Sequence, residues 1–313
     1  MTASQATDRT VGELPEDEWR ARLSGSGVGV RVGPFELLLR VSIVGLHAPL
    51  QRLYRDHPLL EGERVFSCHA DLREVWHFGR RPGRRVRFSV DGLAPHEDMP
   101  AGQGLAVLEW GINLALAMRF HGFLMLHAAV VERNGRALLL PAAPGHGKTT
   151  LCAALVHRGW RLFSDEFGLM RPGGIELIPV PRPMPLKNES ISVIRRFAPD
   201  AEFGPVIPNT RKGTISHLKP PRTSVIRAEE PAPAGWVVFP RWVEGASLSF
   251  ERADPADVFM HLATNAFNYE LLGEPAFEAV SRLIEAAPGY RLIYSDLEQA
   301  VAALDALANG EEP

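Results

Sequence analysis

The sequence predicts an α/β protein in two parts, a smaller mixed α/β domain at residues 27–98 and a larger α/β domain at residues 99–313. Before residue 98, short β-type runs alternate with turn residues, and after it such runs alternate with longer helical patterns. A chain of 313 residues with 45% apolar and 23% charged residues can bury two ordinary cores. Residues 1–26 are polar and carry several Gly and Ser, so we expect a flexible N-terminus there.

The charge balance and the apolar segments indicate a protein that binds neither nucleic acid nor membranes. The formal net charge is −3, unlike that of proteins that coat nucleic acid or a membrane surface. The start of the chain lacks the basic and apolar regions of a signal peptide, and the most apolar stretch, residues 105–123, is interrupted by charged side chains. Two cysteines, Cys68 and Cys152, are too few for a disulfide scaffold, so we expect a cytoplasmic protein.

The smaller domain is expected to be rich in strands. Apolar runs bounded by turn residues predict strands over Val28–Val32, Phe35–Val44 and Arg85–Val90, with a short helix over Leu50–Tyr54. The acidic, proline-bearing segment His96–Pro100 predicts a linker, and the apolar residues 101–120 predict a long helix that opens the larger domain.

The larger domain begins with a hairpin that leads into a glycine-rich loop. Strands are predicted over Phe123–Glu132 and Ala137–Pro141, because Asn134-Gly135 between them is a strong turn signal. A helix over Lys148–His157 follows the loop, with Gly159 at its C-terminal cap, and the next strand is Arg161–Ser164. Further elements are expected at Gly168–Pro181 (hairpin), Ser190–Phe197 (helix), Trp236–Phe239 (strand), Ala256–Leu272 and Pro275–Glu285 (helices), Tyr290–Tyr294 (strand) and Leu297–Leu307 (helix).

The glycine-rich loop has the pattern of a P-loop, or Walker A motif. Its end, Gly147-Lys148-Thr149, matches the pattern, whereas Ala142 replaces the first glycine. Backbone N–H groups of such a loop hold phosphate oxygens, the lysine reaches the β- and γ-phosphates, and the hydroxyl after it binds Mg²⁺. We therefore expect ATP and Mg²⁺ as cofactors. The predicted nucleotide-binding residues are Pro144, Gly145, His146, Gly147, Lys148, Thr149 and Thr150, with Thr149 also a metal ligand.

Two carboxylates and a histidine are the candidates for proton transfer and metal binding. Asp165 and Glu166 follow a strand that is expected to lie beside the P-loop strand, where one can serve Mg²⁺ and the other can accept a proton. An exposed turn with two acidic side chains is the alternative. His127 lies in an apolar strand, where a histidine can equally be a core residue with its hydrogen bonds satisfied.

Together these residues resemble the HPr kinase/phosphorylase family, in which a histidine, a P-loop and an RG-x-RL-x-x-DD segment follow one another. The counterparts are His127, the loop ending in Thr149, and the run from Arg158 to Glu166. The sequence is closest to the subgroup called HPr-kinase-related kinase A, from about residue 30 onward. Hallmarks shared with that subgroup are Glu109-Trp110-Gly111, His127-Ala128-Ala129-Val130, Cys152-Ala153-Ala154-Leu155, Arg182-Pro183, Leu186-Lys187-Asn188-Glu189-Ser190-Ile191, Lys212-Gly213-Thr214 and Phe267-Asn268-Tyr269.

The resemblance implies an HPr-kinase-like P-loop fold for the larger domain and a role for each site residue. Asp165 would be the catalytic acid/base, His127 would support it, Lys148 would bind the transferring phosphate, and Glu166 would serve the metal together with Asp165. The chain departs from the family at Ala142 and Glu166, where the family has Gly and Asp, and it lacks the family's E-x-R-G segment.

A basic segment follows these motifs. Residues 181–227 hold nine Lys and Arg against three acidic residues, and much of the segment is rich in Pro and Gly. We expect residues 204–221 to form a mobile lid over the site, because long irregular loops in compact domains are often functional. A solvated irregular surface is the alternative. Candidate substrate-contacting residues are Arg182, Lys187, Lys212 and His217.

The sequence thus predicts an ATP-dependent phosphotransferase that acts on a serine-type hydroxyl. The resemblance implies a peptide or small-protein acceptor, since relatives act in peptide-modification pathways, and a homo-oligomer is possible. A kinase for a free small molecule such as an amino acid, and a non-catalytic regulatory module that binds nucleotide, are the alternatives.

Overall fold

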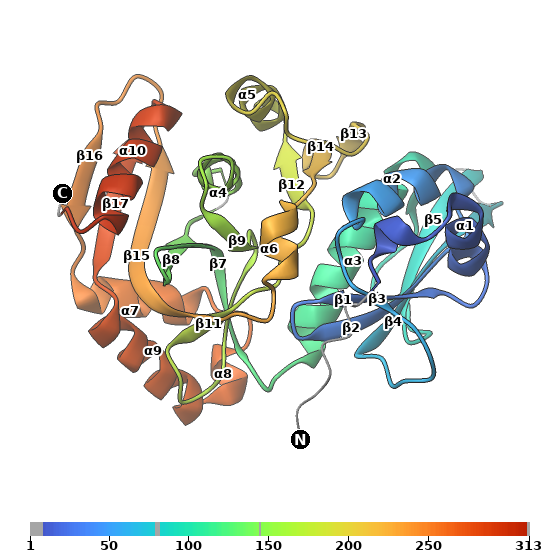
Figure 1. Cartoon of the computed structure of the whole chain (residues 1–313), viewed down its shortest axis with the longest axis horizontal. Helices are drawn as coiled ribbons and strands as arrows, with labels where there is room; N and C mark the ends of the chain where they lie inside the picture. The colour runs from blue at the N-terminus through green and yellow to red at the C-terminus, as the bar shows by residue number, and fades with distance from the viewer. Residues whose placement is uncertain (1–8, 79–81, 144, 312–313) are drawn as a thin grey trace.

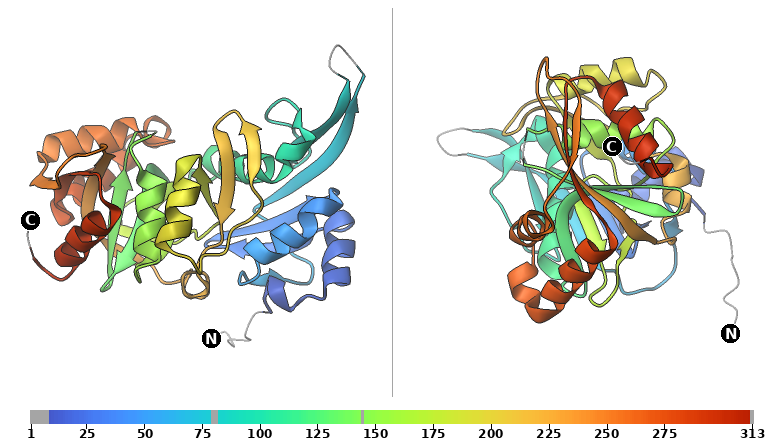
Figure 2. Two further views of the ribbon diagram at one scale, coloured as in Figure 1. Left: turned by 90° about the horizontal axis from the view of Figure 1, so that it is seen from above. Right: turned by 90° about the vertical axis from the view of Figure 1, so that its left-hand side faces the viewer.

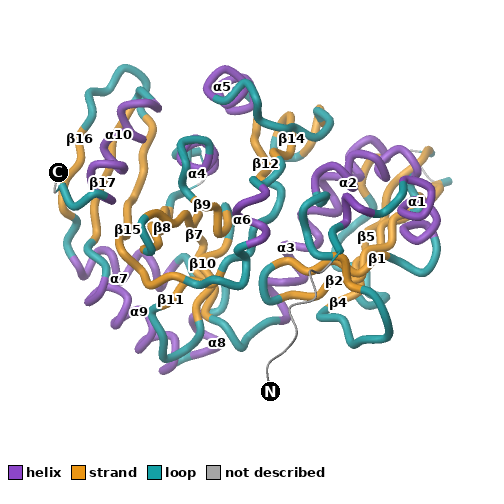
Figure 3. The backbone as a smooth tube through the Cα atoms, viewed as in Figure 1, coloured by secondary structure: helices purple, strands orange, loops and turns teal. Residues whose placement is uncertain are grey.

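The computed structural model describes residues 9–78, 82–143 and 145–311, and these residues form an α/β protein. Figure 1 shows an N-terminal unit on the right, coloured blue to teal, beside a C-terminal unit on the left, coloured green to red. A tube view separates the helices, strands and loops of both units (Figure 3).

The N-terminal unit is a sheet with the strand order β3-β1-β2-β4-β5-β6. Along β2, buried and half-buried residues alternate, as expected of a strand with one face on a core. The strands β1 and β2 were expected, whereas the long β4 was not, and its hairpin with β5 projects from the body in the left view of Figure 2. The bounds are β1 Val28–Val32, β2 Phe35–Val41, β3 Leu59–Leu60, β4 Cys68–His77, β5 Gly83–Val90 and β6 Met99–Pro100.

Short helices cover this sheet, and one of them corrects the prediction of a flexible N-terminus. Within the described part of residues 1–26, η1 (Val11–Glu13) and α1 (Glu16–Ser24) are ordered. Trp19 and Leu23 of α1 are fully buried, and the Trp19 indole N–H donates to the His47 carbonyl at 2.8 Å. The helix is polar overall, so its two apolar anchors were too few to stand out in the sequence. The other short helices are η2 Val44–Leu46, α2 His47–Leu53 and η3 Ala101–Gln103.

The long helix α3 (Gly104–Arg119) packs mainly on β4 and β5 of the N-terminal sheet, and the core that it shares also includes Met125, Phe167 and Leu169 of the C-terminal unit. Gly111 lies against Phe88 of β5, so closely that a Cβ at residue 111 would meet the ring at 2.5 Å. The expected boundary at residues 98/99 is therefore wrong for this helix, which shares the core of the first unit. Among the described residues, no helix is both long enough and apolar enough to cross a membrane.

The C-terminal unit is built on a sheet with the order β11-β10-β7-β8-β15-β17-β16, in which β9 also pairs with β7. The strands β8, β15 and β17 run parallel, and β7 and β16 are antiparallel to their neighbours. The predicted Asn-Gly hairpin is confirmed, with Asn134 at φ 54° and Gly135 at φ 76°. The bounds are β7 Leu124–Arg133, β8 Arg136–Pro141, β9 Arg161–Ser164, β10 Phe167–Met170, β11 Glu176–Ile178, β15 Ala232–Trp242, β16 Ser249–Arg252 and β17 Gly289–Tyr294.

Helices cover both faces of this sheet, so the unit has three layers. On one face α4 (Lys148–Val156) and α10 (Leu297–Ala308) bury an apolar core, and on the other α7 (Pro255–Thr264) and α9 (Glu274–Ala286) bury a second one (Figure 1). The C-terminal helices expected from the sequence are confirmed, except that the first is divided between α7 and α8 (Tyr269–Leu272). The helices α5 (Glu189–Phe197) and α6 (Arg222–Ile226) complete the unit.

The segment predicted to be a mobile lid is instead part of a third, small sheet with the order β12-β14-β13. Its strands are β12 (Met184–Lys187), β13 (Ile207–Thr210) and β14 (Gly213–Leu218), and Ile215 and Leu218 are fully buried. The Asn188 side chain accepts a hydrogen bond from the Thr214 N–H, which ties the hairpin to the end of β12. The sequence suggested an irregular loop because Pro and Gly residues flank β14. The strand β12, which pairs with β14, lies far away in the sequence, so local patterns did not reveal the sheet.

Candidate active site

The glycine-rich loop that the sequence predicts to be a P-loop lies between β8 and α4, at the edge where β8 and its parallel neighbour β15 both end. Gly145 and Gly147 have φ values of 89° and 88°, the left-handed region that glycine adopts without strain. A Cβ on Gly147 would also lie 2.8 Å from the Tyr294 hydroxyl. The His146 carbonyl accepts the Trp242 N–H at 3.1 Å, which holds the loop against the end of β15. The predicted loop residue Pro144 lies outside the described residues.

Lys148 begins α4, so the helix N-terminus and the lysine act on the same space. The Lys148 ammonium nitrogen is buried, yet no side chain or carbonyl accepts a hydrogen bond from it within the described residues. A buried ammonium without an acceptor is costly unless an anion is bound there. Thr149 and Thr150, in the first turn of α4, are half-buried beside it. The helix N-terminus, the buried Lys148 ammonium and the two threonine hydroxyls could together hold an anionic ligand.

Asp165 and Glu166 lie in the short gap between β9 and β10, both of which pair with β7. The prediction that the strand before Asp165 lies beside the strand before the glycine-rich loop is therefore wrong, because β7 lies between β9 and β8. The Ser164 hydroxyl accepts the N–H groups of Glu166 and Phe167, at 3.1 and 2.9 Å, and fixes the turn that carries the carboxylates. Asp165 is only 6% exposed, so the alternative of an exposed acidic turn fails for this residue.

Asp165 carries the most informative electrostatics of the site. Burial and the nearby Glu166 raise its pKa to about 7, against the opposing effect of positively charged side chains that include Lys148. Its Oδ2 is buried without a hydrogen-bond partner in the described chain. Below Asp165 lies Cys152 of α4, whose thiol pKa is raised by burial and by this carboxylate. Asp165 is thus a carboxylate able to gain and lose a proton near neutral pH.

His127 faces the same space from β7, in register with Phe167 of β10. Its Nε2 lies 3.6 Å from Glu166 Oε1, and about a third of its side chain is exposed. Burial and the Lys148 charge lower the pKa of His127, so the imidazole is neutral at physiological pH. The alternative of a fully buried core histidine does not hold, because 30% of the His127 side chain is exposed and its ring lies beside the Glu166 carboxylate.

Two of the four candidate substrate residues lie close enough to Lys148, Asp165, Glu166 and His127 for their charges to act on them. Lys187 ends β12 and Lys212 lies in the β13–β14 turn, and the two ammonium groups repel each other. Burial and Lys212 lower the pKa of Lys187, while Glu166 and Asp165 oppose that shift. The charges of both lysines also act on His127. A cluster of three lysines around two carboxylates leaves an excess of positive charge that favours an anionic ligand.

The other two candidates, Arg182 and His217, are not exposed substrate contacts. Arg182 is 6% exposed and forms an ion pair of 2.6 Å with Glu109 of α3. His217 is fully buried, and burial lowers its pKa to about 4. The sequence prediction failed here because both residues lie where the two units pack together, which local sequence does not reveal.

Sequence reasoning assigned no role to Phe267 and Trp110, which line the site. The Phe267 ring lies 5.3 Å from that of His127, and its N–H donates to Met125 in β7 at 2.8 Å. The Trp110 ring of α3 lies 5.5 Å from the Lys212 ammonium. Both residues lie far in sequence from the residues that they contact. The signal that could have pointed to them is the resemblance described above, whose shared segments include Glu109-Trp110-Gly111 and Phe267-Asn268-Tyr269.

The donor set suits a cation that is bound together with phosphates. Within the described ranges, no three or more His, Cys, Asp and Glu side chains gather as metal ligands. Mg²⁺ at phosphoryl-transfer sites needs only one or two carboxylates, because waters and phosphate oxygens complete its shell. The Thr149 hydroxyl and the carboxylates of Asp165 and Glu166 could supply such a set, and Asp165 Oδ2, which has no hydrogen-bond partner in the described part of the chain, is free to bind a cation.

No family model matches the sequence, and no curated protein matches it. Among solved structures, the chain is similar to the HPr(Ser) kinase/phosphatase from Coxiella burnetii, at 12% identity and a TM-score of 0.27. The match covers 59% of this chain and 94% of the other. A TM-score of this size leaves the family unassigned, so the function has to come from the residues of the site.

Proposed function

We propose that this chain is an ATP- and Mg²⁺-dependent kinase that phosphorylates a serine-type hydroxyl on a peptide or small protein. The observation that carries the proposal is a pair of buried side-chain atoms of opposite charge, Lys148 Nζ and Asp165 Oδ2, that have no hydrogen-bond partner within the described residues. Lys148 lies where the glycine-rich loop enters α4. A phosphate and a metal ion or hydroxyl would satisfy both atoms. The serine-type acceptor and its peptide nature come from the resemblance of the sequence to HPr kinases.

Each side chain has a role in this proposal. Lys148 would bind the β- and γ-phosphates as a point charge, and the N–H groups of Gly145, His146 and Gly147 would hold their oxygens. Bound ATP and Mg²⁺ would supply an electrophilic phosphoryl group whose charge is partly neutralised. Asp165 would accept the proton of the acceptor hydroxyl as its oxygen attacks, which a pKa of about 7 allows.

His127 and Lys187 would act on the partners of that step. The neutral imidazole of His127 can donate a hydrogen bond to Glu166 and so orient this carboxylate for the cation. Lys187 would stabilise the charge that develops on the transferring group, because it already lies among the acidic residues. Phe267 would cover the site beside His127 and limit access of water.

The test is mass spectrometry of serine-containing peptides, including those encoded beside this gene, after incubation with the protein, ATP and Mg²⁺. A mass increase of one phosphate on a peptide, absent with Asp165→Asn, is the expected result. Release of ADP without any acceptor should be measured in parallel. Turnover that only a free amino acid increases would replace the peptide by a small molecule. Slow ADP release that no acceptor increases would overturn the kinase in favour of a regulatory module.

A further inference from the structure

The end of β15 lies against the glycine-rich loop, on the side opposite to the acidic pair. The Trp242 N–H donates to the His146 carbonyl at 3.1 Å, and a Cβ on Gly147 would lie 3.2 Å from the Trp242 Cβ. In the sheet, β8 lies between β15 and β7, and β7 pairs with both strands that flank Asp165 and Glu166. The loop therefore has the carboxylates toward one side and Trp242 toward the other.

The Trp242 indole is fixed in place and yet 47% exposed. Its N–H donates to the Ser295 carbonyl, just beyond the end of β17, at 3.1 Å. Trp242 is in register with Tyr294 of β17, whose side chain lies in the core under α4 and α10. Residues in register on neighbouring strands point to the same face of a sheet. The indole is thus on the face that carries α4, whose N-terminus receives the glycine-rich loop.

The turn that follows β15 is ordered and keeps apolar side chains exposed. Val243 is 36% and Leu248 39% exposed. The Val243 N–H donates to the Tyr294 carbonyl at 2.9 Å, and the Ser295 hydroxyl donates to the Ala246 carbonyl at 2.8 Å. These hydrogen bonds hold the turn to the end of β17. Exposed apolar side chains in an ordered segment beside a candidate site are typical of a ligand contact.

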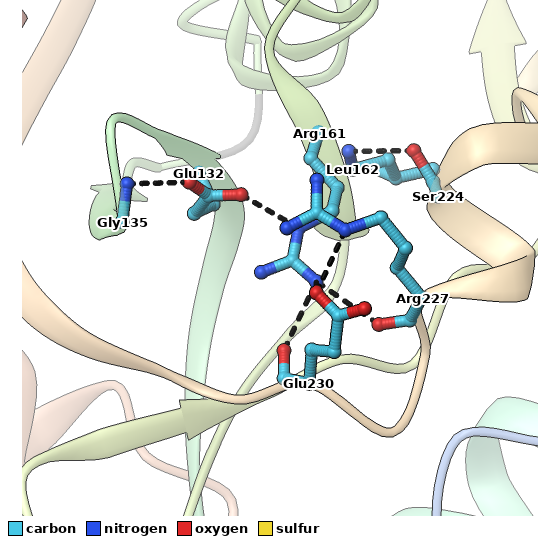
Figure 4. Close-up of polar contacts among 7 residues, drawn as sticks. All are labelled: Glu132, Gly135, Arg161, Leu162, Ser224, Arg227 and Glu230. Atoms are coloured by element: carbon cyan, nitrogen blue, oxygen red, sulfur yellow. Dashed lines mark hydrogen bonds and ion pairs between the residues drawn. The ribbon is translucent and has the colours of Figure 1, made fainter.

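The unpaired charge of Lys148 marks the phosphate end of a ligand at this place. A second buried cation of the same unit shows the usual arrangement, since Arg161 forms an ion pair of 2.6 Å with Glu132. Its Nη1 also donates to the carbonyls of Arg227 and Glu230 at 2.9 and 3.0 Å. Figure 4 shows Arg161 between Glu132 and the loop after α6. The Lys148 ammonium has no such acceptor within the described residues, so a bound anion is its expected partner.

The phosphate end alone does not distinguish a nucleotide from an inorganic polyphosphate, because a glycine-rich loop and a lysine contact only phosphate oxygens. The strand order supplies the missing information. Ligands of open α/β sheets lie across the carboxyl ends of the parallel strands. Here those strands are β8, β15 and β17, and Trp242 closes β15. A ligand whose terminal phosphate points toward Asp165 therefore extends its other end over Trp242.

We propose that Trp242 is the stacking platform for the base of a nucleoside triphosphate, so that the phosphoryl donor is a nucleotide and not an inorganic polyphosphate. This inference rests on the proposed function in taking the glycine-rich loop as the phosphate site. Stacking suits a fixed and exposed indole, because every base presents a flat π-face and the contact needs no hydrogen bond to the edge of the base. The β15–β17 end of the sheet binds the base, and the acidic side binds the terminal phosphate.

Isothermal titration with MgATP and with magnesium tripolyphosphate, which carries the phosphates without the base, tests this role. Trp242→Ala and Trp242→Leu should raise the Kd of ATP about tenfold and leave that of tripolyphosphate unchanged. Trp242→Phe, which keeps an aromatic face, should retain most of the affinity for ATP. Lys148→Ala should weaken both ligands. An unchanged Kd of ATP in whichever of the Ala and Leu variants folds, or an equal loss for both ligands, would overturn the role of Trp242.

Trp76 is the matched control, because it is a tryptophan of β4 that is 61% exposed and lies in the other unit. Trp76→Ala should leave both affinities unchanged, and a loss of ATP affinity equal to that of Trp242→Ala would count against a specific site. A second measurement needs only conservative variants. ATP should quench the tryptophan fluorescence of wild type and of Trp76→Phe but not that of Trp242→Phe. Equal quenching in all three proteins would overturn stacking on Trp242.

These readouts are independent of turnover, so the two proposals can fail separately. Binding of ATP that depends on Trp242, in a protein that phosphorylates no acceptor, would keep the base site and remove the kinase. Phosphorylation of a peptide with the same Kd of ATP in wild type and in the Trp242 variants would keep the kinase and remove the base site. A wild-type protein that binds tripolyphosphate but not ATP would overturn the base site as well.

Discussion

His127 Nε2 lies 3.6 Å from Glu166 Oε1, across the boundary between β7 and the β9–β10 turn. The gap is wider than a good hydrogen bond, as is common for catalytic groups that have no ligand bound. The contact joins two residues that the sequence singled out for separate roles, His127 as a support for the catalytic carboxylate and Glu166 as a metal ligand. Four predictions follow from the arrangement around this pair.

Asp165→Asn should make the protein more stable at alkaline pH. Because the pKa of Asp165 is raised to about 7 in the folded protein, ionising it disfavours the folded state. The contribution of Asp165 to the free energy of unfolding of the wild-type protein is fully present below pH 4 and is lost as the pH rises through 7. The free energy of unfolding of the variant should therefore exceed that of wild type by on the order of 2–4 kcal/mol at pH 8 and should be nearly equal to it at pH 4.

Thermal unfolding of both proteins across pH 4–8 measures this difference. Comparing variant with wild type at each pH cancels the opposite trend from His57 and His217, whose pKa values burial lowers to about 4. A stability difference that is the same at all pH values would mean that Asp165 has an ordinary pKa.

Lys148→Ala should abolish most phosphoryl transfer while leaving the fold intact. Loss of a preorganised charge at the transferring group costs about 3–4 kcal/mol, a decrease of 10² to 10³ in turnover. Lys219→Ala is the control, because Lys219 pairs with Asp56 and Glu202 and not with the site. Circular dichroism of both variants reports whether the fold is intact, and their turnover reports the loss of phosphoryl transfer. Near-wild-type turnover by a folded Lys148→Ala protein would contradict the P-loop assignment.

Gly147→Ala should be far more damaging than Gly145→Ala, although both positions have φ near 89°. Each substitution costs roughly 1–2 kcal/mol for the left-handed backbone. At Gly147, however, the new methyl would also meet the Tyr294 hydroxyl at 2.8 Å and Trp242 at 3.2 Å, whereas at Gly145 nothing lies within 4 Å. Melting temperatures and the affinity for ATP should both show this order. Equal losses would mean that the loop relaxes around either methyl group.

The β13–β14 hairpin should be protected from hydrogen exchange even without nucleotide. Residues 215–218 of β14 are buried and pair with β12, and Ile215 also pairs with β13, so their amides should open only when the small sheet opens. The exposed turn at residues 244–245 should exchange quickly in the same experiment. Fast exchange over the whole of β14 in the free protein would restore the mobile lid that the sequence suggested.

The local features of the site could be predicted because each depends on neighbouring residues. The Asn134-Gly135 turn needs two residues with positive φ, and the P-loop needs glycines between a strand and a helix. Strand and helix periods likewise follow from local alternation. These signals were enough to single out Lys148, Asp165 and Glu166 as candidate site residues.

The tertiary structure alone decided which distant residues share the site. Arg182 and His217 were candidates because of their charge or chemistry, yet packing between the units buried both, and only Lys187 and Lys212 reach the cluster. The raised pKa of Asp165 and the placement of β7 between it and the P-loop strand depend on burial and strand order. The sequence by itself determined the α/β class, the glycine-rich turn between a strand and a helix, and the residues able to do chemistry, because short-range sterics and hydrogen bonding specify them. The position of α3, the folded hairpin and the electric environment of Asp165 were decided only by tertiary structure, because they arise from contacts between segments far apart in the chain.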